Sequence, residues 1–239
     1  MSAALDVYSQ HSNPSLGRQW VLAHVGAQVV FLAAAGIAYL SSVAIGAEDP
    51  AAGVTLKRIA LGLTVAADVI FALAFAWMRG AVLQVAVPKF PMTLWMIVVT
   101  GYMSAFFVLG NVFGVTPAVA PPTSIAPTLF FGGLMAALIA GALLGAVFGT
   151  VEALVIRRAA QGALLWVVWM AAAYSVDIAV LYSASVLALQ TLGATALTTT
   201  SLAASAALVG VMKIFAGLIL ALVTLPALKA LRPHHQVAR

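Results

Sequence analysis

Six long runs of apolar residues constrain the fold of this chain more than any other feature. They cover approximately residues 19–45, 58–78, 91–113, 127–156, 163–190 and 202–228. A membrane core about 30 Å thick takes about 20 apolar residues per helix, so each run is long enough to cross. Lipid cannot satisfy free backbone groups, and the sequence shows no alternating barrel pattern. The sequence therefore predicts an all-α integral membrane protein, a bundle of six transmembrane helices.

The composition supports this prediction and argues against several classes of function. Hydrophobic residues make up 64% of the chain, charged residues only 7%, and the mean hydropathy is +1.13, unlike a soluble domain. The chain has no cysteine, which excludes disulfides and thiolate metal sites. It also lacks a nucleotide-binding glycine loop, a zinc-protease motif and a nucleophile elbow. We expect no cofactor and no bound metal, and we favour a protein that is not an enzyme.

The basic residues lie at the ends of the apolar runs and not on one face. The net charge of +5 therefore reflects the orientation of the helices in the membrane and indicates no nucleic-acid partner. One side of the membrane receives Arg18, Arg79, Lys89, Arg157, Arg158, Lys229, Arg232 and Arg239. The positive-inside rule then places both termini in the cytoplasm, and we expect the cell's inner (plasma) membrane. We divide the chain into a polar tail (1–18), the six-helix domain (19–228) and a basic tail (229–239).

The fourth run carries a stripe of small residues at every fourth position. The stripe consists of Gly133, Ala137, Gly141, Gly145 and Gly149. Residues four apart share one face of a helix, so another backbone can approach this face closely. We favour packing inside the bundle, with a homo-oligomer or a membrane-protein partner as the alternative.

Ionisable residues inside the apolar runs are the main candidates for a functional site. A charge at the centre of a membrane costs about 2.5 to 3.5 kcal/mol on insertion scales, so each one needs a reason. Asp177 and Lys213 lie near the middle of consecutive antiparallel runs and are expected to form an ion pair. That pair either is a fixed contact that sets the register of the two helices or breaks and re-forms during transport. Asp68 shares Lys213 or, without it, is expected to be protonated.

The fifth run has a polar face around its aspartate. On a helical wheel, Tyr174, Ser175, Asp177, Tyr182 and Ser185 share one broad arc, and Ser183 falls outside it. The arc predicts a hydrated cavity lined by hydroxyl groups and a carboxylate. The alternative is that the serines bond to carbonyls of their own helix and the tyrosine rings pack.

Two further polar residues lie near the expected cytoplasmic ends of their runs. Glu152 is within reach of an interfacial salt bridge with Arg157 or Arg158, which favours a topological role. His24 is interpreted as a packed or interfacial histidine.

Two functional hypotheses follow from these residues. The first is a transporter or channel for a small solute or ion, coupled to protons through Asp68, Asp177 and Lys213. The second is a non-catalytic accessory or assembly subunit of a larger membrane complex, which docks through the small-residue stripe. An enzyme that acts on lipid ranks third.

Overall fold

Six long helices make up almost all of the structure, a computed structural model that describes residues 14–49, 51–113, 127–192 and 199–234. The helices are α2 (Pro14–Ala44), α3 (Val54–Ala86), α4 (Met92–Phe113), α5 (Pro127–Ile156), α6 (Ala163–Leu192) and α7 (Thr199–Ala230). All six are long and apolar enough to cross a membrane. The predicted all-α bundle of six membrane-spanning helices is therefore confirmed.

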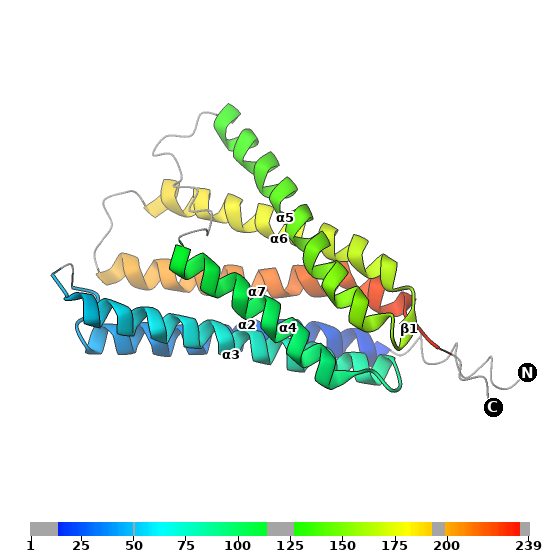
Figure 1. Ribbon diagram of the computed structural model, residues 1–239. Coiled ribbons are helices and arrows are strands. Elements are labelled where there is room, and N and C mark those ends of the chain that lie inside the picture. Colours follow the sequence, from blue (N-terminus) through cyan, green and yellow to red (C-terminus); the bar gives the residue numbers. More distant parts are fainter. Residues whose placement is uncertain (1–13, 50, 114–126, 193–198, 235–239) are drawn as a thin grey trace, which may run out of the picture.

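The helices pack as neighbouring antiparallel pairs (Figure 1). The closest pairs are α5 with α6 and α2 with α3, while α7 packs against both α2 and α6 and α4 packs against α3. The start of α2 and the end of α7 lie at the same end of the bundle (Figure 1). At that end β1 (Ala160–Gln161) pairs antiparallel with β2 (Arg232–Pro233), which ties the α5–α6 connection to the end of α7. The cytoplasmic location of this end remains a prediction.

The α5–α6 connection is built around one glycine. Gly162 has a φ of +88°, a conformation that side chains rarely allow, and a Cβ there would lie 2.8 Å from the carbonyl oxygen of Ala230. A residue with a side chain would push α7 away. This glycine therefore permits the close approach that β1 and β2 make.

Helix α3 is longer than the sequence analysis predicted. The second run was expected to end at residue 78, with Arg79 outside it, but α3 continues to Ala86 and Arg79 is fully buried. The residues after Arg79 are apolar apart from Gln84, and the first helix breaker is Pro88. A helix that remains in lipid keeps its backbone hydrogen bonds, so it continues until that proline.

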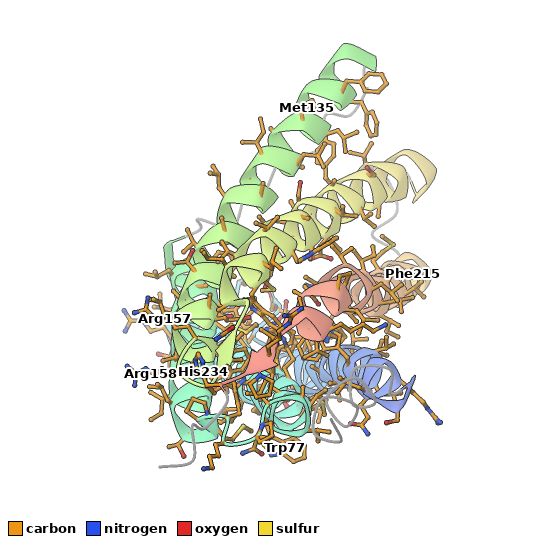
Figure 2. The ribbon with its side chains drawn as sticks, turned by 90° about the vertical axis from the view of Figure 1, so that its right-hand side faces the viewer. Trp77, Met135, Arg157, Arg158, Phe215 and His234 are labelled. Atoms are coloured by element: carbon orange, nitrogen blue, oxygen red, sulfur yellow. The ribbon has the colours of Figure 1, made fainter. Side chains whose placement is uncertain are left out.

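The outer surface of the bundle is apolar, as lipid requires. Trp77, Met135 and Phe215 project outward from α3, α5 and α7 (Figure 2) and are 58%, 56% and 52% exposed. An exposed apolar surface of this extent is typical of contact with a membrane. The predicted lipid-bilayer environment accounts for it.

The small-residue stripe of α5 packs against α6. A Cβ on Gly141 or Gly145 would overlap with the backbone oxygen of Tyr174 or Met170, respectively, and one on Gly149 would lie 2.8 Å from the Met170 Cβ. At the far end of the stripe, Gly133 packs against the Tyr182 hydroxyl and Ala137 is buried. The two backbones therefore touch from Gly141 to Gly149, and the Tyr182 side chain fills the space at Gly133. Helix α6 occupies this face of α5.

We expect Gly145→Ala to destabilise the fold by about 1 to 3 kcal/mol, because its methyl group overpacks the α5–α6 contact. Gly132→Ala on the same helix is the matched control, since a Cβ there meets nothing within 4 Å. The control should melt like the parent or slightly higher, because alanine favours a helix. Thermal unfolding of detergent-purified protein, followed by circular dichroism, measures both variants. Equal melting temperatures for the two would contradict the packing.

Candidate functional site

A fully buried ion pair joins α3 to α5 near the end of the bundle where α7 terminates. The Arg79 Nη1 and Nη2 atoms lie 2.7 Å and 2.8 Å from the two carboxylate oxygens of Glu152. Both side chains have an exposed fraction of 0%. Two parallel hydrogen bonds fix the direction of both groups as well as their distance. The pair therefore holds α3 and α5 in one register.

Two more donors complete the hydrogen bonding of the Glu152 carboxylate. The Tyr102 hydroxyl of α4 donates to Oε1 at 2.5 Å, and the Trp166 indole of α6 donates to Oε2 at 2.7 Å. Each carboxylate oxygen thus accepts two hydrogen bonds, one of them from Arg79. A buried carboxylate needs this degree of pairing, because its desolvation costs several kcal/mol.

Aromatic rings surround the guanidinium group. The Arg79 Cζ lies 4.6 Å from the ring centroid of Phe75 and 5.4 to 5.6 Å from those of Trp20, Trp95 and Trp166. Ring faces attract a cation, and the attraction increases once water is excluded. These rings therefore form an apolar enclosure that also stabilises the positive charge.

The tryptophans extend this cluster to the remaining helices. Trp20 of α2 donates to the Thr224 hydroxyl of α7 at 3.0 Å, and Trp95 of α4 donates to the Ala76 carbonyl of α3 at 2.8 Å. His24 is 1% exposed, with its Nδ1 3.0 Å from the Trp20 carbonyl. All six helices therefore contribute to one polar and aromatic cluster.

The structure gives Glu152 a partner different from those expected. Arg157 and Arg158 are exposed at the end of the bundle (Figure 2), whereas Arg79 holds both oxygens of the carboxylate. The expected salt bridge with Arg157 or Arg158 is therefore wrong. Sequence reasoning missed Arg79 because it treated the charge as the end of a helix. The uninterrupted apolar stretch up to Pro88 was the available signal.

A pocket of about 160 Å³ lies in the middle of the bundle, next to this cluster. Asp177 and Lys213 both line it and come from near the centres of α6 and α7. Its other lining residues are Gln28, Phe71, Phe75, Met103, Phe106, Phe107, Leu144, Phe148, Tyr174, Ile178, Ala216 and Leu220. Every helix supplies at least one of these residues, and most of the wall is aromatic or aliphatic.

Asp177 and Lys213 face the same pocket without the direct contact that the sequence suggested. The Asp177 Oδ1 atom is buried and has no hydrogen-bond partner, and the same holds for Gln28 Oε1. The Lys213 Nζ atom lies 5.0 Å from the ring centroid of Phe31. No ion pair between Asp177 and Lys213 is found in the described part of the chain, so that expected pair is not confirmed. The pocket therefore holds polar groups that a ligand could satisfy.

The other residues of the predicted polar arc lie in different surroundings and do not form one polar face. Tyr174 lines the pocket, but Tyr182 packs near Gly133 and Phe130. Ser183 donates to the Ala179 carbonyl of its own helix at 2.8 Å, whereas Ser175 donates across to Leu138 of α5. Asp68 is buried in α3 outside the pocket lining, and the Ser185 side chain lies outside the described residues.

Aromatic side chains connect the ion pair to the pocket. The Tyr102 ring stacks on Phe148 with centroids 4.6 Å apart, and Phe148 lies 5.5 Å from Tyr174. Phe75 touches the guanidinium of Arg79 and also lines the pocket. The cluster therefore forms one wall of the pocket, between it and the end of the bundle where α7 terminates.

Comparison of the chain with protein-family models, with curated proteins and with solved structures finds no match. The function is therefore inferred from the Arg79–Glu152 cluster and from the pocket that Asp177 and Lys213 line.

We expect Arg79→Met and Glu152→Leu each to destabilise the protein by about 3 to 5 kcal/mol, because each leaves a buried charge unpaired. The double variant contains neither charge and should be more stable than either single variant. Thermal unfolding in detergent measures all three.

Arg157→Ala is the control, since its exposed side chain does not contact Glu152. It should melt like the parent protein. A loss of stability equal to that of Arg79→Met would contradict the pairing described above.

Proposed function

We propose that the protein transports a small solute or ion across the membrane and couples that movement to protons. The observation that carries the proposal is the pocket in the middle of the bundle. It combines oppositely charged side chains, Asp177 and Lys213, with contributions from all six helices. Ionisable residues inside a membrane commonly mark pathways for substrates or protons.

The position of the pocket suits alternating access. Transporters commonly bind their substrate near the middle of the membrane, where helix movements can open the site to one side and then the other. Asp177 and Lys213 come from the centres of their helices, so the pocket is far from both ends of the bundle. A site built from six helices changes shape when any one of them moves.

Asp177 is the group we assign to proton coupling. Its carboxylate has one oxygen without a hydrogen-bond partner and shares the pocket with a cation, Lys213. A carboxyl group in this setting can gain or lose a proton as a ligand or the lysine approaches. Binding of solute and binding of a proton would then affect each other.

No observation favours the accessory-subunit alternative. That hypothesis used the small-residue stripe of α5 as a docking surface, and α6 occupies this stripe at Gly141 and Gly145. The outer surface offers apolar side chains suited to lipid. Transport is therefore the function that we carry forward.

Asp177→Asn is expected to abolish transport while the fold is kept, because the amide has the shape of the carboxylate but cannot carry its charge. The measurement uses proteoliposomes that contain a trapped pH-sensitive dye and are exposed to a proton gradient and a panel of small solutes. The parent protein should give solute-dependent proton flux, and the variant should fall to the level of empty vesicles.

Ser183→Ala is the matched control, because this hydroxyl bonds within its own helix and does not line the pocket. It should transport like the parent. Unaltered flux through Asp177→Asn would overturn the proposed mechanism, and a parent protein with no solute-dependent flux would count against transport itself.

A further inference from the structure

We infer that the central pocket binds a small solute that carries a primary ammonium group. The pocket contains two buried hydrogen-bond acceptors without a donor, Asp177 Oδ1 and Gln28 Oε1. These side chains are only 8% and 5% exposed. Binding of this solute can be measured without any transport assay. Only its transport rests on the proposed function.

Two unpaired acceptors favour a ligand that donates hydrogen bonds. A buried polar group without its partner costs about 1 to 3 kcal/mol. An ammonium group has three donors and no acceptor, so it has enough donors for both oxygens. One of these bonds joins a cation to a carboxylate and is therefore among the stronger kinds. A hydroxyl group donates only once, and a carboxylate ligand donates nothing.

The walls of the pocket also suit a cation. Phenylalanine rings from α3, α4 and α5 line it: Phe71, Phe75, Phe106, Phe107 and Phe148. Aromatic faces attract cations, and this chain already holds its own cations in that way. Lys213 lies over Phe31 and Arg79 over Phe75, at 5.0 Å and 4.6 Å.

The volume of the pocket limits the solute to a small molecule. It measures about 160 Å³, close to the roughly 150 Å³ of a cavity that holds benzene. Butylamine and the amino acid norvaline, which is butylamine with an added carboxylate, are of suitable size. Both supply the ammonium group, and only norvaline has a carboxylate that could contact Lys213. The two are therefore alternative sources of one recognised group.

Calorimetric titration of the purified full chain in detergent tests this inference. The four probes are butylamine, norvaline, 1-butanol and valerate, which carry the ammonium group, both charged groups, a neutral hydroxyl and the carboxylate alone. Butylamine, norvaline or both should bind at least about tenfold more tightly than the other two probes. A stronger effect of Lys213→Met on norvaline than on butylamine identifies the amino acid as the source, and an equal effect identifies the amine.

Variants of the two acceptors connect binding to the proposed contacts. Asp177→Asn should weaken binding of the ammonium probe about tenfold or more, and Gln28→Met should weaken it less. The second variant keeps the test valid if the first does not fold. Ser183→Ala, whose side chain is outside the pocket, should bind like the parent.

The inference is overturned if butanol or valerate binds as tightly as the ammonium probes, or if a folded Asp177→Asn protein binds them undiminished. Ammonium binding without solute-dependent proton flux would keep this inference and overturn the proposed transport. Proton flux that depends on other solutes, without ammonium binding, would keep the proposed transport and overturn this inference.

Discussion

The fully buried contact between Arg79 and Glu152 is the interaction on which the arrangement of the six helices depends. Neither charge reaches solvent, and a membrane protein can keep such a pair only if the two charges offset each other at close range. Four hydrogen bonds to the carboxylate come from α3, α4 and α6, and the enclosing rings include Trp20 of α2. A shift of any one of these helices would expose or unpair a charge. The cluster therefore favours one packing of the bundle.

The central pocket differs from that cluster in one physical respect. Both oxygens of Glu152 are saturated with donors, whereas Asp177 and Gln28 each leave an oxygen unpaired. A buried carboxylate with saturated oxygens is typical of a structural contact, and one with an unpaired oxygen calls for an explanation such as a ligand or water. This difference is why we assign stability to Arg79 and Glu152 and solute handling to Asp177 and Lys213. Aromatic rings connect the two sites: Tyr102 stacks on Phe148, and Phe148 meets Tyr174 edge to face.

The sequence predicted the helices well because lipid makes the pattern simple. An apolar run must form a helix, and breaks that contain proline, glycine or charged residues mark its ends, so α5 was predicted over the residues that it occupies. The error at α3 arose because a lone arginine resembles the end of a span. Its partner, Glu152, lies 73 residues further along the chain, and a single sequence does not show which distant charges meet.

The candidate site was predictable only in part, for a similar reason. Asp177 and Lys213 stood out because unexplained charges in apolar runs are few. The aromatic lining and Gln28 did not, since phenylalanine is an ordinary membrane residue and the polar arc of α6 says nothing about the helices opposite. The direct ion pair was not confirmed, for a similar reason: periodicity places side chains on a face of a helix, but it gives no distances between helices.

A solute pathway through the pocket requires that water reach it, and the absence of cysteine from the chain allows this to be measured with single introduced thiols. Ala216→Cys places a thiol in the pocket wall, while Ala221→Cys places one in the buried core on the same helix. We expect a small, membrane-impermeant thiol reagent to modify the first variant from at least one side of sealed vesicles and to leave the second unmodified. Equal protection of both thiols from both sides would mean a sealed polar core and would contradict a solute pathway through the pocket.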